Sequence, residues 1–302
     1  MLALAAYAAA VVKLLIHYGG VPIARDLLVP IVLVGFLAVS VASVARLRRV
    51  VVGIFVDWAP FLLALWLYDL VRGYADGAVI GVQYAPQIRL DELFGGGVVP
   101  SLWLQQHLWH GSASVRWYDY LTWVVYISYF FGTTAVLVVL WWRSRRLFWR
   151  FASNVLALSF VGCLTFFLYP ADPPWLASQQ GYIVGSIERL IGPIGSHIPV
   201  ISGARLWETG TGYANPVASM PSLHAAFTFL IALFLVTRTR SRWRHLLWLY
   251  PLAMTFALVY SGEHYVVDVL AGWIYAAVVF FGIEWAIEAY SQRGRAVAQP
   301  SS

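Results

Sequence analysis

The feature that most constrains this chain is a series of long apolar runs with almost no charge inside them. A helix needs about 20 apolar residues to cross the hydrocarbon core of a bilayer, and eight blocks of the chain approach that length. They cover about residues 2–18, 27–45, 50–71, 119–142, 151–170, 221–237, 246–262 and 264–290. Only 11% of the 302 residues are charged, whereas a soluble domain carries about 25%. The sequence therefore predicts an all-α, polytopic integral membrane bundle and excludes a soluble enzyme, a disordered chain and a secreted disulfide scaffold.

The basic residues indicate how such a bundle would be oriented. Thirteen of the 20 lie in four segments without any acidic residue, at about 46–49, 143–150, 238–244 and 293–295. Basic loops stay on the cytoplasmic side, which predicts cytoplasmic termini and two long outward loops, 72–118 and 171–220. The first block contains Lys13 and no small-residue cleavage site after it, so we expect an anchored helix rather than a removed signal peptide. The net charge of +6 is then an orientation signal in a multi-pass plasma-membrane protein, and nucleic acid is not an expected partner.

A first group of polar residues lies at the predicted outer start of the sixth block. His224 follows Pro221 and Ser222 there. A proline near the first helical position leaves no extra donor unsatisfied, and the free N–H groups of a first helical turn favour an anion. The Ser222 hydroxyl adds a further donor to the same anion.

A second group lies at the outer start of the last block. His264 and Asp268 are four residues apart, so on a helix they share one face. The aspartate can accept from one ring nitrogen, which leaves the other nitrogen free as nucleophile or base. Gly262 gives the backbone freedom for a tight turn before the helix. The predicted topology places both groups on one side of the membrane, where they can converge on one anion.

Two other interpretations of these residues are open. Each histidine can simply cap a helix at the membrane interface, but ionisable residues at membrane depth are functional candidates by default. Two histidines and an aspartate can also bind zinc. The Pro-Ser turn suits phosphate better, and no further ligand cluster is present, so we assign no metal.

At these residues the sequence resembles a known family. The segments Met220–Ala226 and Tyr260–Gly272 resemble the second and third signatures of the type 2 phosphatidic acid phosphatase (PAP2) superfamily. Tyr169–Trp175 resembles the preceding segment of its inositol phosphorylceramide synthase-like, or aureobasidin-resistance-like, branch. The resemblance spans roughly residues 119–290 and implies a six-helix catalytic core. We accordingly divide the chain into N-terminal helices (1–71), an outer loop with an interfacial helical stretch (72–118), the core (119–290) and a cytoplasmic tail (291–302).

The resemblance implies a role for each matching residue. His264 would attack phosphorus and form a phosphohistidine, with Asp268 orienting it. His224 would protonate the leaving oxygen and then activate the acceptor, either water or an alcohol. Ser222, with Pro221 shaping the turn, would hold the phosphoryl oxygens, and no cofactor is required.

The chain departs from the phosphatase pattern in its cations. No Lys…Arg-Pro signature occurs, and Ala257-Leu258 stands where the phosphatases carry Ser-Arg. A phosphodiester monoanion needs less positive charge than a monoester dianion. The resemblance therefore favours headgroup transfer on a lipid at the outer leaflet, with lipid phosphate hydrolysis as the alternative.

Further residues are candidates for substrate binding. Arg72 and Asp69, at the outer end of the third block, either bind a headgroup or form an interfacial pair. Arg205 is either a phosphate ligand or a solvated loop charge. Asp172 and Trp175 either shape a lid over the site or end the fifth span, where proline stops the helix. The motif residues Tyr260 and Gly262 complete the candidate set.

Functions of other classes are also compatible with a multispanning chain. A transporter of a lipid or anionic solute would place its charges near the bilayer midplane, between repeated halves, whereas here they lie at helix ends and no repeat is visible. A scaffold with decayed catalytic residues would not retain all three candidates. The sequence does not identify the lipid, its headgroup or the acceptor. It does not indicate the oligomeric state either.

Overall fold

The computed structural model describes residues 2–18, 25–41, 43–72, 74, 81–198, 215 and 217–298. Their regular structure is helical, and the only sheet-like pairings among them are two isolated bridges, Gln83 with Ala171 and Ala171 with Ala218. The helices are α1 (Leu2–Tyr18), α2 (Arg25–Ser40), α3 (Val44–Gly53), η1 (Ile54–Trp58), α4 (Ala59–Arg72), α5 (Ala85–Phe94), α6 (Pro100–Leu108), η2 (Ser112–Ser114), α7 (Trp117–Arg143), α8 (Arg145–Leu168), α9 (Pro174–Gln179), α10 (Ile191–Gly195), α12 (Leu223–Arg238), η3 (Arg242–Trp248), α13 (Leu249–Tyr260) and α14 (Val266–Ala298).

The apolar blocks correspond to the long helices, which confirms the all-α membrane bundle. Among the described residues, four helical segments are long and apolar enough to cross a membrane: Val44–Arg72, Trp117–Arg143, Arg145–Leu168 and Val266–Arg293. Shorter apolar helices form at Ala3–Leu14, Val29–Ser40 and Leu223–Arg238. The block at 50–71 is longer than expected because α3, η1 and α4 continue one another, and the block at 246–262 is divided between η3 and α13. Eight crossings remain a prediction.

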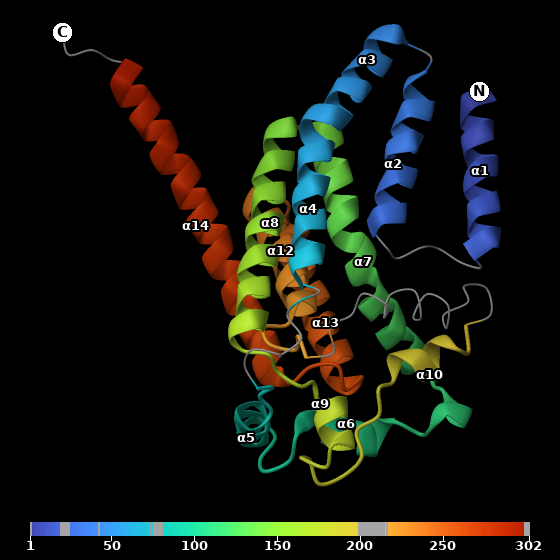
Figure 1. Ribbon diagram of the computed structural model, residues 1–302, viewed down its shortest axis with the longest axis vertical. Coiled ribbons are helices and arrows are strands. Elements are labelled where there is room, and N and C mark those ends of the chain that lie inside the picture. The colour runs from blue at the N-terminus through green and yellow to red at the C-terminus, as the bar shows by residue number, and fades with distance from the viewer. Residues whose placement is uncertain are drawn as a thin grey trace.

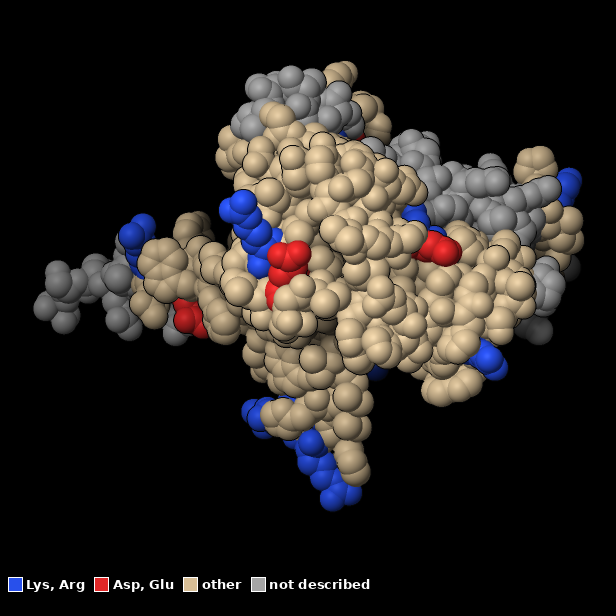
Figure 2. Space-filling view, turned by 90° about the horizontal axis from the view of Figure 1, so that it is seen from below, with Lys and Arg blue, Asp and Glu red and all other residues tan. Residues whose placement is uncertain are grey.

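The two ends of the bundle differ in what they carry. The short helices α5, α6, α9 and α10 gather at one end, whereas the start of α3, the α7–α8 turn and the end of α14 lie at the other (Figure 1). The arginine-rich segments are thus separated from the short helices by the length of the bundle. Viewed from the end with the short helices, most of the surface is uncharged, with a few separate acidic and basic side chains (Figure 2).

The centre of the bundle is the crossing of α12 and α14. Helix α12 is buried along most of its length, including Ala225, Ala226 and Leu230. A Cβ atom at Gly272 of α14 would lie only 2.4 Å from the carbonyl oxygen of Ser222, so only glycine permits this approach. The close crossing brings the starts of both helices, and their candidate residues, to one place.

A buried carboxylate ties α4 to α7 and α8. Asp57, in the π-helical turn η1, is fully buried. It accepts hydrogen bonds from the indole Nε1 of Trp141 at 2.9 Å and of Trp149 at 2.8 Å, and from the Arg145 guanidinium at 2.6 Å. Asp57 is therefore a structural hydrogen-bond partner.

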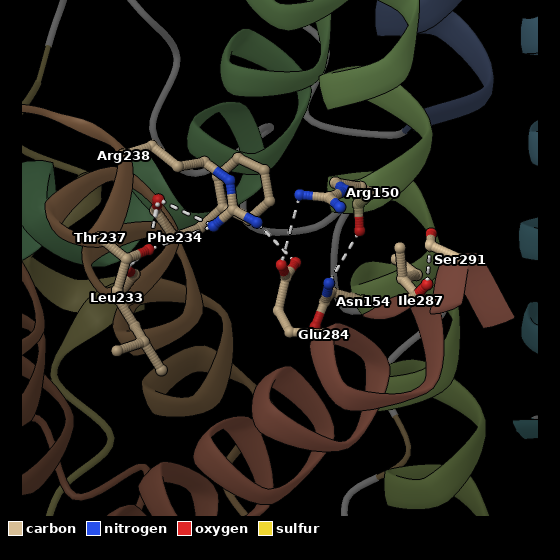
Figure 3. A network of polar contacts seen from close by, with 9 residues as sticks. All are labelled: Arg150, Asn154, Leu233, Phe234, Thr237, Arg238, Glu284, Ile287 and Ser291. Carbon is tan, nitrogen blue, oxygen red and sulfur yellow. Dashed lines mark hydrogen bonds and ion pairs between the residues drawn. The ribbon is translucent and has the colours of Figure 1, made fainter. Parts of the chain in front are cut away.

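An ionic cluster joins α8, α12 and α14. The Glu284 carboxylate lies between two guanidinium groups, 2.5 Å from Arg238 and 3.5 Å from Arg150 (Figure 3). Arg238 also covers the ring of Phe234, with 3.7 Å from guanidinium carbon to ring centroid. Asn154 donates to the carbonyl of Arg150 at 2.7 Å. The cluster joins three helices through one carboxylate.

We expect Glu284→Gln to lower the free energy of unfolding by about 1–3 kcal/mol, because it leaves two partly buried cations facing each other. The measurement is thermal unfolding of the purified protein in detergent. Glu288→Gln is the matched control, since Glu288 is exposed on the same helix and surface substitutions usually change stability by less than about 0.5 kcal/mol. Equal shifts for the two variants would contradict the role of the cluster.

Candidate active site

A tight turn between α13 and α14 presents His264. Gly262 adopts a φ of +75°, a conformation that favours glycine, and a Cβ atom there would lie 2.9 Å from the carbonyl oxygen of Glu188. The tight turn expected at Gly262 is therefore confirmed. His264 and Asp268 are buried, with 7% and 0% of their surfaces exposed.

The carboxylate of Asp268 is held by three groups on one oxygen. Its Oδ2 accepts from the Ser219 hydroxyl at 2.5 Å and from the backbone N–H of Tyr265 at 3.0 Å. It also lies 3.5 Å from Nδ1 of His264, and the Ser219 hydroxyl is 3.4 Å from the same nitrogen. Ser219 thus connects the histidine with the aspartate, a role that the sequence analysis missed.

His224 faces His264 across the site. The two imidazole centroids are 5.7 Å apart. Aromatic rings from α7 surround His224, with centroids at 4.0 Å for Tyr129, 5.0 Å for Tyr126 and 6.0 Å for Phe130. Its Nε2 is buried and has no hydrogen-bond partner among the described residues.

Ser222 is the N-cap of α12. Its hydroxyl accepts from the N–H of Ala225 at 3.3 Å, and its own N–H donates to the backbone carbonyl of Asp268 at 3.0 Å. The helix begins at Leu223, so Pro221 precedes the cap. The sequence predicts this proline near the first helical position. In the structure it lies one residue earlier, before the N-cap serine. The hydroxyl hydrogen of Ser222 and the first N–H groups of α12 remain suited to an anion.

The C-terminal end of α4 carries Arg72 and Asp69, which lie 3.8 Å apart. The guanidinium carbon of Arg72 is 5.6 Å from the ring centroid of Tyr68. A role for this pair in headgroup binding stays a prediction. Arg205 lies outside the described residues.

The segment that follows α8 packs against the catalytic turn. The N–H of Trp175 donates to the carbonyl of Gly262 at 3.2 Å, and the N–H of Asp172 donates to that of Gln83 at 3.0 Å. Asp172 is 2% exposed, and burial raises the pKa of its carboxyl above the usual range. The segment therefore supports the turn as well as ending the span.

Tyr260 points away from the two histidines. Its hydroxyl donates to Asp119, at the start of α7, at 2.6 Å. Its carbonyl accepts from the side-chain amide of Gln105 at 2.9 Å, and that amide also bonds to both backbone groups of Glu188. In this geometry Tyr260 joins helices, and its role in substrate binding stays a prediction.

A second cation beside the site was also missed. Arg189 forms a bidentate pair with Glu263 at 2.8 and 3.1 Å and covers the ring of Trp175 at 4.8 Å. Arg189 is thus held beside the turn that carries His264. Glu263, next to the nucleophile candidate, was a signal for a cationic partner, but the sequence did not distinguish Arg189 from the other outer arginines. The described residues contain no group of three His, Cys, Asp or Glu side chains arranged to hold a metal.

Comparisons with known proteins show the family of the chain. The family model of the PAP2 superfamily matches residues 88–282. The phosphoinositol dihydroceramide synthase of Bacteroides thetaiotaomicron is 28% identical over 225 residues, which covers 70% of this chain and 71% of that protein. The inositol phosphorylceramide synthase catalytic subunit aur1 of Schizosaccharomyces pombe is 28% identical over 125 residues, 41% of this chain and 29% of that protein. No solved structure matches. The chain therefore belongs to the PAP2 superfamily, as a lipid phosphotransferase or phosphatase.

Proposed function

We propose that the chain transfers a phosphate-linked headgroup from a phospholipid to a lipid alcohol, through a phosphohistidine on His264. The observation that carries the proposal is the facing pair His264 and His224, 5.7 Å apart at the ring centroids, with Asp268 and Ser219 behind one of them. One histidine of this pair supplies the nucleophile, and the other acts as the general acid and base.

The first half-reaction begins with attack of His264 Nε2 on phosphorus. Nδ1–H of His264 points to the Ser219 hydroxyl, which donates to Asp268; this tautomer leaves the lone pair of Nε2 available. As the N–P bond forms, the bond from phosphorus to the lipid alcohol breaks, and His224 gives its proton to the leaving oxygen. The headgroup phosphate is then bound to His264.

The second half-reaction returns the headgroup to a lipid. His224, now neutral, takes the proton of the acceptor hydroxyl, whose oxygen attacks phosphorus and displaces Nε2. Ser222 and the first N–H groups of α12 would hold the phosphoryl oxygens in both steps. His264 is regenerated, so the cycle needs no cofactor.

The cations of the site favour a diester over a monoester. Arg72 is paired with Asp69, and Arg189 is paired with Glu263. Both of these positive charges are therefore partly neutralised, which suits a phosphate with one negative charge. The names of the two relatives point to phosphoinositol as the headgroup and a ceramide-type alcohol as the acceptor.

The distribution of arginines supports an outward-facing site. The arginine-rich segments lie at the end of the bundle opposite the short helices (Figure 1), and basic segments stay in the cytoplasm. We therefore place the site at the outer leaflet of the plasma membrane, with both termini cytoplasmic.

The test is incubation of purified protein with headgroup-labelled phosphatidylinositol and either dihydroceramide, diacylglycerol or no acceptor. We expect the label on the ceramide-type lipid. Release of inositol phosphate or inorganic phosphate in equal amounts with and without acceptor would replace transfer by hydrolysis. No reaction with any acceptor would reject the proposed donor.

A further inference from the structure

Asp91 connects a short surface helix to the start of α14. It lies on α5, outside the membrane-spanning helices, and its side chain is 0% exposed. One carboxylate oxygen accepts from the N–H of Val266 and the other from the N–H of Val267, both at 3.0 Å. A residue 175 positions earlier in the chain thus caps the helix that follows His264.

These contacts fill the place where α14 would attract an anion. The first N–H groups of a helix have no partner within it, and together with the helix dipole they favour negative charge. In α14 that place is taken by the Asp91 carboxylate. The start of α12, with His224 and the Ser222 hydroxyl, is left for the phosphate.

We propose that Asp91 is a positioning residue, which holds the first turn of α14 so that His264 and Asp268 face the phosphate site at α12. Its part in turnover depends on the proposed function; its part in ordering α14 does not. The charge also keeps the substrate phosphate away from the start of α14.

The contacts of α14 show how a displaced first turn would reach the chemistry. The N–H of Tyr265 donates to the Asp268 carboxylate, and the carbonyl of Asp268 accepts from Ser222. A shift of this turn therefore moves His264, its aspartate and the start of α12 relative to one another. A misplacement of about 1 Å can lower a rate about 10²-fold.

Helix α5 packs against the start of α14 with one side only. Leu90, Leu93 and Phe94 on α5 are exposed, whereas Gln87, Ile88 and Asp91 are buried. One side of the helix faces solvent or lipid while the other reaches the start of α14.

The protonation of Asp91 gives the proposal a pH signature. Burial, together with the charge of Asp268, raises the pKa of its carboxyl to about 7, although the two backbone hydrogen bonds lower it. Tyr265 is the other titratable group facing it, while His107 of α6 turns to the carbonyl of its own Trp103. Above pH about 7 the ionised carboxylate accepts both hydrogen bonds, and below it one oxygen becomes a hydroxyl and one hydrogen bond is lost.

Hydrogen–deuterium exchange tests the ordering of α14 without any substrate. We expect peptides covering Val266 and Val267 to exchange about tenfold faster or more in Asp91→Ala, because each lost bond to a charged acceptor corresponds to at least that factor. Glu92→Gln, which removes the neighbouring charge of α5, is the matched control. Equal exchange in the two variants overturns the proposal, even if the proposed reaction is correct.

The catalytic part of the proposal is tested by measuring headgroup transfer from phosphatidylinositol to dihydroceramide. Asp91→Ala is expected to lower kcat about 10²-fold with KM within about twofold. Asp91→Asn keeps one acceptor oxygen and provides a second variant if the alanine form does not fold. We expect its kcat to fall about tenfold, and its activity should no longer rise as the pH increases through about 7. The proposal would be overturned if kcat were unchanged or if only KM were impaired. It would also be overturned if Asp91→Asn still gained activity as the pH rises through about 7.

Discussion

His264→Ala is expected to lower turnover by about 10⁶-fold, the size of effect produced when the nucleophile of a coupled catalytic set is removed. The reason is that no other described residue brings a nitrogen nucleophile opposite His224. The measurement is transfer of labelled headgroup by the purified variant, with its folding checked by thermal unfolding in the same detergent.

The control for His264→Ala is His245→Ala. His245 is exposed in η3, directly after the arginine-rich segment 238–244. We expect this variant to retain full activity. Turnover retained by a folded His264→Ala protein would remove the nucleophile from the account.

Asp57→Ala is expected to lower the free energy of unfolding by about 2–6 kcal/mol, because its carboxylate is the acceptor of two indole N–H groups and each buried donor left unpaired costs about 1–3 kcal/mol. The change leaves the indole N–H groups of Trp141 and Trp149 without their acceptor, and a cavity opens in η1. Thermal unfolding in detergent measures the loss.

Arg145→Gln separates the indole contacts of Asp57 from its ion pair. The Arg145 side chain is 54% exposed, and exposed ion pairs contribute about 0–1 kcal/mol, so this variant should unfold close to the wild type. A loss for Arg145→Gln as large as that for Asp57→Ala would show that the ion pair, rather than the indole bonds, stabilises this region.

The parts of the fold that the sequence predicted are those determined by local pattern. Apolar blocks long enough to span a membrane predicted the long helices, because a segment in lipid must form its backbone hydrogen bonds within itself, as a helix does. His224, His264 and Asp268 were found because they follow helix starts at short spacing, and the structure brings them together at the α12–α14 crossing.

The parts that were missed depend on contacts between distant segments. Asp91 is one acid among several in a long outer loop, and nothing near it in sequence indicates that it caps α14. Ser219 stands directly before the Pro-Ser turn, but its contact with His264 and Asp268 requires the glycine-mediated approach of two helices. The pairing of Arg189 with Glu263 likewise depends on how the outer loop folds back.

The central claim is that the headgroup phosphate is transiently bound to His264. The most direct measurement is to mix the wild-type protein with phosphatidylinositol labelled in its phosphate, without acceptor, quench in base and digest. We expect label on the peptide containing His264, lost in acid, discharged by added dihydroceramide, and absent from His264→Ala. An unlabelled protein that still transfers the headgroup when acceptor is added would contradict it.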